Sequence, residues 1–242
     1  MIRSISIVFP CYNEADRLKY TFKDIQKFQE NKVANNFEII FVNDGSSDNT
    51  FQILKKYKKE NTKLNKRIKI ISYQNNKGKG YALKKGISIA KFDWILTLDT
   101  DISVSITQLS DWIKHKKIKK ENLIYFGSRN LTDSNIKFKM YRKLIGLIFI
   151  KIIKIFFNIN LSDTQCGFKL YKKDIARKLF SNLKMLDFTH DIEIVLKSKK
   201  KGYRIKELPV NWIHKKGSKI SVFKDSLKMF ISLLKIKFIY SK

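Results

Sequence analysis

Two carboxylates, Asp99 and Asp101, stand one residue apart at the end of an apolar run in the segment DWILTLDTDIS. Like charges this close repel, so each raises the pKa of the other, and a divalent cation removes that penalty. Mg²⁺ and Mn²⁺ prefer oxygen ligands and are often held by one or two carboxylates together with substrate phosphates. The pair therefore predicts a site for Mg²⁺ or Mn²⁺ and a diphosphate, against the simpler alternative of two solvated turn residues.

The segment VNDGSSDNT also follows an apolar run. Its aspartate, Asp44, can close a strand in a tight turn, and Ser46, Ser47 or Asp48 can cap the helix that follows. In that interpretation the segment is a well-made strand-to-helix turn. The alternative is that Asp44 accepts a hydrogen bond from the edge of a nucleotide base or from a ribose.

The segment NNKGKGYALKKG places glycines beside lysines at the expected start of a helix. Backbone N–H groups and the side chain of Lys77 or Lys79 could donate to phosphate oxygens there. The segment matches neither the phosphate loop GxxxxGK[ST] nor the dinucleotide fingerprint GxGxxG, which argues against NAD binding in the usual manner. A generic glycine-rich turn stays open as the alternative.

These clusters must be positioned by the elements that precede them. Runs of β-branched residues predict strands over residues 4–10, 37–44, 68–73, 94–99 and 123–128. Apolar residues at helical spacing predict helices over residues 14–29, 49–59 and 80–90. Alternating strands and helices predict an α/β fold with a mostly parallel sheet covered by helices on both faces. The polar clusters fall at the carboxyl ends of the strands, where such sheets bind ligands.

Beyond residue 130 the pattern changes. A long apolar segment, 139–158, precedes the loop LSDTQCGFKLY at 161–171; we then expect helices over 174–183 and 191–201, a strand over 203–212 and a basic C-terminal helix. No internal repeat and no linker rich in Pro, Gly or Ser is visible. We therefore expect residues 1–242 to form one domain, with a nucleotide-binding half at about 1–101 and a second half at about 102–242.

The composition limits the setting in which the protein works. The formal net charge of +30 indicates anionic partners such as phosphorylated molecules, nucleic acid or an anionic membrane, unless it reflects a general bias towards lysine. Two cysteines are too few for a disulfide framework, which favours a reducing cytoplasm. The N-terminal residues lack a signal-peptide pattern, and the longest apolar stretch, 144–157, falls short of the ~20 residues that span a bilayer. These features predict a cytoplasmic protein that is soluble or bound to a membrane surface.

Taken in order, these motifs resemble glycosyltransferase family 2, whose members have the GT-A fold. The resemblance covers VFPCYNEADRL (8–18), FVNDGSSDNT (41–50), NKGKGYALKKGI (76–87), DTD (99–101) and GSRN (127–130). Two further segments, SDTQCGFKLY (162–171) and YRIKELPVNWIHKKGSK (203–219), are more narrowly similar to the branch that makes dolichyl- or polyprenyl-phosphate sugars, especially the dolichyl-phosphate glucosyltransferases. The resemblance implies a Rossmann-like GT-A domain that transfers a hexose from a nucleotide sugar.

The resemblance also implies a donor site for a UDP-sugar. Residues expected to wall the nucleotide are Pro10, Tyr12, Asn13 and Glu14. Asp44 would contact the uracil, with Lys77 and Gly78 nearby. Asp99 would touch the ribose or the sugar. Asp101 would bind the metal on the diphosphate, and Asp99 would be a second residue at the metal. The basic segment HKKGSK would fold over the diphosphate through Ser218 and Lys219; a solvated charge run is the competing interpretation.

On the acceptor side, Arg129 and Arg142 match arginines that the family places near the acceptor phosphate. Arginine suits this role because its planar fork can bind two phosphate oxygens. Asp191 is the candidate catalytic base, or a charge that orients the acceptor, and Glu193 is a weaker candidate. His190 stands where the family pattern suggests an aromatic residue. Asp191 could instead be the N-cap of the helix that follows it.

Two segments have the pattern of membrane-surface helices. In the first, 143–158, Lys143, Lys151, Lys154 and Asn158 share a narrow stripe on an otherwise apolar helix. In the C-terminal helix, Lys224, Lys228 and Lys235 face away from Phe223, Leu227, Phe230, Leu233 and Leu234. Basic amphipathic helices can lie in the interface of an anionic membrane. The alternative is that both helices only cover the core.

The sequence therefore predicts an inverting, metal-dependent transferase that moves a hexose, from the resemblance glucose, from a UDP-sugar to a polyprenyl or dolichyl phosphate. It would act peripherally on the cytoplasmic face of a membrane, in the synthesis of cell-envelope glycans. A family 2 enzyme acting on a sugar hydroxyl of a cell-surface polysaccharide or glycolipid is the alternative, and it would need Asp191 as a true base. The sequence has no motif typical of nucleic-acid-binding proteins, which argues against such a partner.

Overall fold

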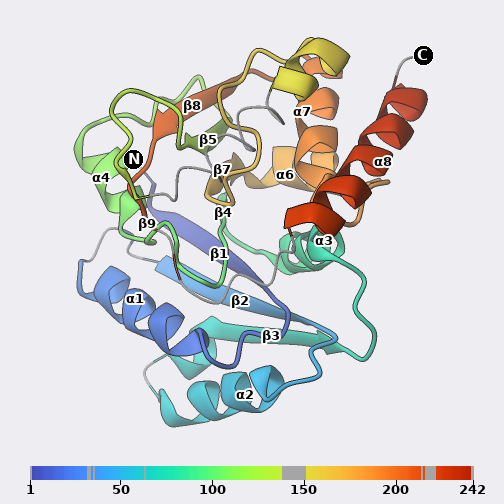
Figure 1. Cartoon of the computed structure of the whole chain (residues 1–242). Coiled ribbons are helices and arrows are strands. Elements are labelled where there is room, and N and C mark those ends of the chain that lie inside the picture. Colours follow the sequence, from blue (N-terminus) through green and yellow to red (C-terminus); the bar gives the residue numbers. More distant parts are fainter. Residues whose placement is uncertain are drawn as a thin grey trace.

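The computed structural model describes residues 2–31, 34, 36–62, 64–137, 151–213, 215 and 222–240. Its centre is a seven-stranded sheet with the order β3-β2-β1-β4-β7-β5-β8 (Figure 1). The strands are β1 (Ser4–Cys11), β2 (Asn36–Asp44), β3 (Ile68–Tyr73), β4 (Trp94–Thr97), β5 (Ile124–Ser128), β7 (Lys169–Lys172) and β8 (Ile205–Pro209). Strand β7 alone in this sheet is antiparallel to its neighbours, so the predicted mostly parallel sheet is confirmed.

Helices cover both faces of this sheet. One apolar cluster contains residues of α1 (Leu18–Glu30), α2 (Thr50–Glu60) and α4 (Gln108–Lys114). The other cluster contains residues of α3 (Lys79–Ile89), α6 (Lys173–Phe180), α7 (His190–Lys200) and α8 (Val222–Tyr240), and of the helical residues 151–157. A short 3₁₀ helix, η1 (Asn65–Arg67), precedes β3, and β6 (Ile136–Lys137) pairs with β9 (Trp212–Ile213) in a small second sheet. The architecture is the predicted α/β fold.

Strand β1 shows how the sequence builds the two layers. Successive side chains of a strand point to opposite faces of the sheet. Ile7 and Phe9 accordingly lie in the cluster under α1 and α2, whereas Val8 lies in the cluster under α3. All three are fully buried, and burying each side chain contributes about 1.5–3 kcal/mol. This double burial explains why the strands read as continuous apolar runs.

The second half of the chain departs from the sequence-based expectation in several places. Strand β7 begins inside the segment 161–171 that we expect to be a loop, and two short strands, β8 and β9, replace the expected strand 203–212. Helix α4 has no counterpart among the expected elements. Strand β7 is central because it pairs with β4 on one side and β5 on the other. Its buried Lys169 is paired with Asp191, which lies 22 residues away in sequence.

The C-terminal helix α8 is partly buried. Leu233 and Ile236 are inaccessible and belong to the core, whereas Ile231, Leu234 and Phe238 are 58%, 46% and 79% exposed. The side chains of 222–230, and with them Lys224, Lys228, Phe223, Leu227 and Phe230, lie outside the described residues, as do residues 138–150 with Lys143. The described part of the other segment is helical up to residue 157, so Asn158 lies beyond its end. Within the part of the chain that the structure describes, no helix is both long and apolar enough to cross a bilayer.

Candidate active site

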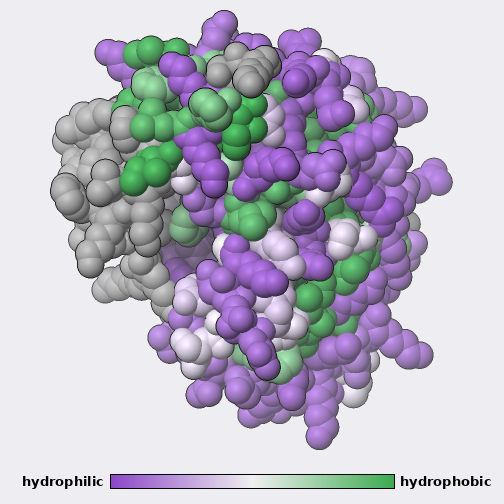
Figure 2. Space-filling view, turned by 90° about the vertical axis from the view of Figure 1, so that its right-hand side faces the viewer, coloured by the Kyte–Doolittle hydropathy of each residue, from purple (hydrophilic) through white to green (hydrophobic). Residues whose placement is uncertain are grey.

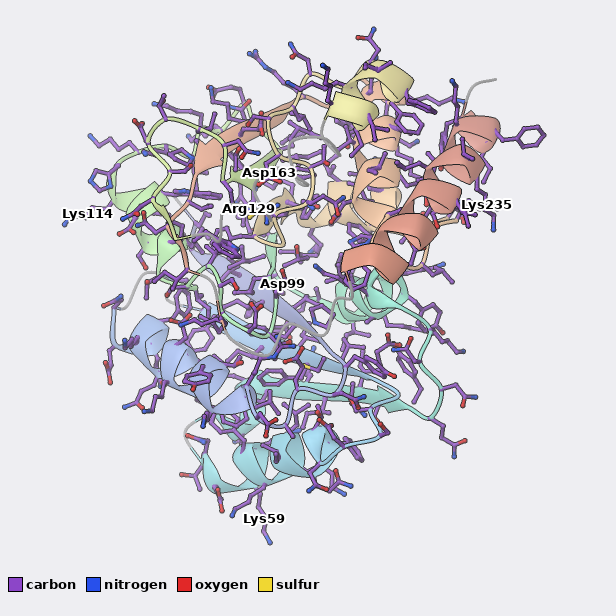
Figure 3. All side chains as sticks on the ribbon, viewed as in Figure 1. Lys59, Asp99, Lys114, Arg129, Asp163 and Lys235 are labelled. Atoms are coloured by element: carbon purple, nitrogen blue, oxygen red, sulfur yellow. The ribbon has the colours of Figure 1, made fainter. Side chains whose placement is uncertain are left out.

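The carboxylate pair lies beyond the end of β4, near the centre of the molecule, where Figure 3 labels Asp99. Lys79, the first residue of α3, places its Nζ 2.5 Å from Asp99 Oδ1. The Oδ1 atom of Asp101 accepts a hydrogen bond from the backbone N–H of Ser103 at 2.9 Å, and Arg17 Nη1 lies 3.8 Å from its Oδ2. Each carboxylate of the pair thus has a cationic neighbour from a different element.

This pair suits a divalent cation. Burial, followed by the charge of Asp99, raises the pKa of Asp101 above its ordinary value, which is the penalty that a bound cation relieves. No group of three or more His, Cys, Asp or Glu residues that could hold a metal occurs among the described residues. The protein would therefore supply Asp101 and Asp99, and substrate phosphates and water would complete the coordination, as Mg²⁺ and Mn²⁺ sites commonly do.

Arg17 is a member of this site that the sequence motifs do not predict. Glu14 holds its guanidinium through two hydrogen bonds of 2.5 Å, from Nε and Nη2, and so directs the remaining nitrogen, Nη1, towards Asp101. The backbone N–H of Glu14 is itself bonded to Thr50 Oγ1 at 2.7 Å. Glu14, predicted to wall the nucleotide, thus also positions an arginine beside the carboxylate pair. The spacing of an acidic and a basic residue three positions apart was the available signal.

The other residues predicted to wall the nucleotide differ in exposure. Asn13 braces two loops: its backbone N–H donates to Ser46 Oγ at 2.9 Å, and its Oδ1 accepts from the backbone N–H of Ser47 at 2.8 Å. Tyr12 is 44% exposed and Pro10 is partly exposed. Pro10 and Tyr12 therefore have surface to offer a ligand, while Asn13 fixes the loop that carries them.

Asp44 is buried and organises the glycine-rich turn. Its carboxylate accepts hydrogen bonds from the backbone N–H of Lys77 (2.8 Å) and of Gly78 (2.9 Å), and from Asn76 Nδ2 (2.9 Å). Gly78 has a φ of +97°, and a Cβ there would lie 2.3 Å from Leu186 O, so only glycine fits. The contact of Asp44 with uracil stays a prediction; in this structure its oxygens hold the turn that precedes Lys79.

Arg129 is held by a residue that the sequence analysis did not single out. Its Nε and Nη2 donate to the two oxygens of Asp163, at 2.7 and 3.0 Å, and Figure 3 shows both residues above Asp99. Asp163 is 1% exposed, and Nη1 of Arg129 has no hydrogen-bond partner among the described residues. The guanidinium is thus fixed with one nitrogen available. Arg142, Ser218 and Lys219 lie outside the described residues.

Asp191 lies in a buried cluster of charges. Lys169 from β7 donates its Nζ to Asp191 Oδ1 and to Thr164 O, and the side chains of this ion pair are 2% and 6% exposed. His190 Nε2 lies 3.1 Å from the same carboxylate oxygen, and its Nδ1 lies 2.7 Å from Asp187 O. Both ring nitrogens of His190 therefore face an acceptor oxygen.

These neighbours control the ionisation of Asp191. Burial alone would raise its pKa, but the charges of His190 and Lys169 outweigh burial and hold the pKa below the usual range of an aspartate. Asp191 lies in the first turn of α7, whose N-cap is Thr189, so the N-cap interpretation of Asp191 is wrong. Glu193, the weaker candidate, is fully buried and accepts from the backbone N–H groups of Lys184 and Met185.

The seven-stranded sheet with helices on both faces has the GT-A fold. The family model of glycosyl transferase family 2 matches residues 6–180, and the chain belongs to this family. The protein is therefore a glycosyltransferase, as the sequence motifs predict.

Its relatives include the dolichyl-phosphate beta-glucosyltransferases of Dictyostelium discoideum and Saccharomyces cerevisiae. Each is 32% identical to this chain; the matches cover 98% of it and 74% and 75% of the respective relatives. The predicted resemblance to this branch is confirmed. Glucosyl-3-phosphoglycerate synthase from Mycobacterium tuberculosis, in complex with Mn²⁺, UDP and glucosyl-3-phosphoglycerate, shares the fold. Its TM-score is 0.67 at 14% identity, with 97% of this chain and 80% of that chain covered.

Proposed function

We propose that this glycosyltransferase moves glucose from UDP-glucose to a dolichyl or polyprenyl phosphate, with inversion at the anomeric carbon and with a divalent metal. The observation that carries the proposal is the buried pair of Asp191 and Lys169. A carboxylate with a lowered pKa and a lysine partner is a weak proton acceptor. An acceptor that is already anionic needs no base, and a lipid phosphate is such an acceptor.

The donor would bind at the carboxyl ends of β1, β2 and β4. Asp101 and Asp99 would hold Mg²⁺ or Mn²⁺, and Lys79 lies where it can exchange Asp99 for a diphosphate oxygen. Bound there, the cation would neutralise charge that develops on the departing diphosphate. The glucosyl-3-phosphoglycerate synthase with this fold, crystallised with Mn²⁺ and UDP, supports this assignment by analogy.

The chemical step needs positioning more than proton transfer. An oxygen of the lipid phosphate forms a bond to the anomeric carbon, while the bond from that carbon to the diphosphate oxygen breaks and its electron pair leaves with UDP. Attack from the opposite face inverts the configuration. The available Nη1 of Arg129 would orient the acceptor phosphate, and Arg142 would share this role. Ser218 and Lys219 would close over the diphosphate.

Asp191 has a positioning role in this proposal. It balances Lys169, whose charge would otherwise be buried without a counter-ion. Transfer to a neutral sugar hydroxyl would instead need a carboxylate that accepts a proton near neutral pH.

A lipid acceptor requires contact with a bilayer, and α8 carries a suitable surface. The exposed side chains of Ile231, Leu234 and Phe238 are spaced as one face of a helix. Ile155, from the helical residues 151–157, is 72% exposed, and Lys237 Nζ lies 4.5 Å from the ring of Phe156, which joins the two helices. Figure 2 shows the side of the molecule that lies on the right in Figure 1, where α8 is. Hydrophobic surface gathers in the upper left of that view and is bordered by hydrophilic surface. We propose that this surface binds an anionic membrane peripherally.

The proposal is tested by a panel of donors and acceptors. Radiolabelled UDP-glucose, UDP-galactose, UDP-N-acetylglucosamine and GDP-mannose are each offered with undecaprenyl phosphate, dolichyl phosphate or a soluble oligosaccharide, with and without Mn²⁺. We expect label in the lipid fraction with UDP-glucose and a lipid phosphate, and only with the metal. Transfer to the oligosaccharide but not to either lipid would contradict the proposal.

A further inference from the structure

A small pocket is lined by both Asp99 and Arg129. Its lining includes Asp99, Ser103, Arg129, Gln165 and Trp212. The cavity measures about 30 Å³, which is room for very few water molecules and not for a whole sugar ring. A ligand bound at Asp99 could therefore place only one small polar group in it.

Gln165 has an unusual environment in this pocket. Its Nε2 atom is buried and has no hydrogen-bond partner among the described residues. Its backbone N–H is fixed by Asp163 Oδ1 at 3.0 Å, in the same turn that holds Arg129. A buried amide donor without a partner carries a free-energy cost. A group that binds in the pocket and accepts this hydrogen bond would recover that cost.

Asp99 also lines the pocket. Its Oδ1 pairs with Lys79, and its Oδ2 lies against Gly167, where an added Cβ would be 2.4 Å from that oxygen. The pocket thus combines an amide donor with a carboxylate acceptor. A hydroxyl group both donates and accepts and satisfies the two together, whereas a phosphate oxygen only accepts and is repelled by the carboxylate.

We propose that this pocket receives one hydroxyl group of the donor hexose, which accepts from Gln165 Nε2 and donates to Asp99. Gln165 is then a residue that determines which hexose is transferred. The inference rests on the proposed function for the identity of the donor. A site built to bond a hydroxyl discriminates against other hexoses, because its own buried groups stay unpaired when that hydroxyl is absent or inverted. In this protein, the turn that carries Gln165 would provide that discrimination.

The test combines Gln165→Leu with four donors, the 2-, 3-, 4- and 6-deoxy analogues of UDP-glucose. We expect Gln165→Leu to lower kcat/KM for UDP-glucose roughly 5- to 150-fold. With the wild-type enzyme, kcat/KM for one deoxy analogue should be lower than for UDP-glucose by a similar factor. With Gln165→Leu, kcat/KM for this analogue and for UDP-glucose should be the same. Thr164→Val is the matched control, since Thr164 Oγ1 is also buried without a partner among the described residues but does not line the pocket. The proposal is overturned if Gln165→Leu leaves kcat/KM for UDP-glucose unchanged. It is also overturned if, for all four analogues, the loss caused by the variant multiplies with the loss caused by the missing hydroxyl.

A binding measurement separates this inference from the proposed function. In calorimetry with Mn²⁺, Gln165→Leu should weaken the binding of UDP-glucose and leave the binding of UDP unchanged. If no lipid phosphate accepts glucose but this pattern holds, the acceptor assignment fails and the role of Gln165 stands. If transfer proceeds while the variant binds UDP-glucose as tightly as the wild type, the role of Gln165 is wrong.

Discussion

The two sides of the site pair their charges differently. The carboxylates beyond β4 stay accessible: the side chains of Asp99 and Asp101 are 42% and 25% exposed. On the other side, Asp163 and Asp191 are 1% and 6% exposed, in contact with Arg129 and Lys169. An accessible pair can exchange its partners for a metal and a diphosphate, whereas a buried pair is part of the framework. This difference supports our proposal that Asp99 and Asp101 bind the metal and the diphosphate, and that the two buried ion pairs hold the framework of the site.

The largest effect is expected from Asp101→Ala. If Asp101 holds the metal on the diphosphate, its loss should lower kcat/KM by roughly 10²–10³ or more, as for loss of a group that stabilises developing charge. Manganese-dependent binding of UDP in calorimetry should disappear as well. Asp133→Ala removes an exposed carboxylate elsewhere and should change neither measurement. Unchanged turnover by the Asp101→Ala variant would refute the proposal that the carboxylate pair exchanges its partners for a metal and a diphosphate.

Asp163→Asn should act on stability. The side chain of Arg129 is only 23% exposed, and a neutral asparagine is a poorer partner for its guanidinium than the Asp163 carboxylate. We expect the free energy of unfolding to fall by about 3 kcal/mol, measured by urea denaturation. The exposed aspartate Asp111 serves as the control, since Asp111→Asn should be near neutral. Equal stability of the two variants would show that Asp163 is not part of the framework.

A smaller effect is expected from the exposed face of α8. Phe238→Ser removes a side chain that is 79% exposed, so folding should be unaffected. Partition to vesicles that contain anionic lipid should fall about tenfold or more if the ring enters the bilayer. Tyr20→Ser removes an aromatic ring that is 46% exposed on α1 and should leave partition unchanged. Similar vesicle binding by both variants would show that the exposed face of α8 does not bind the membrane.

The smallest effect is expected from pH on turnover. The pKa of Asp191 is held below its ordinary value, so its ionised form is present throughout the neutral range. A carboxylate with a lowered folded pKa stabilises the protein above its unfolded pKa of about 3.9, and this stability is lost as pH falls further. We expect kcat/KM to show no ionisation of Asp191 between pH 5.5 and 7. Because Lys169 lowers the pKa of Asp191, an ionisation in this range that Lys169→Met moves to higher pH would identify Asp191 as a base.

The sequence reveals the first half of the site better than the second. The run before Asp99 is buried on both faces, so its strand and the carboxylates beyond it follow from local patterns. Lys169 reads as an exposed residue in a loop, because nothing nearby in sequence shows that Asp191 neutralises it. The pairs Arg129–Asp163 and Lys169–Asp191 span 34 and 22 positions, and only the fold brings their members together. Gln165 likewise becomes notable only once its amide is seen to be buried.

The central claim is that Asp191 balances a buried cation and does not remove a proton. Asp191→Asn alone is a poor test, since it leaves Lys169 buried without its counter-ion and destabilises the fold. The double variant Lys169→Met with Asp191→Asn removes both charges. With UDP-glucose, Mn²⁺ and a lipid phosphate, we predict that this folded variant keeps kcat/KM within about tenfold of the wild type. A loss of the 10²–10⁴-fold that general base catalysis typically contributes would contradict the account.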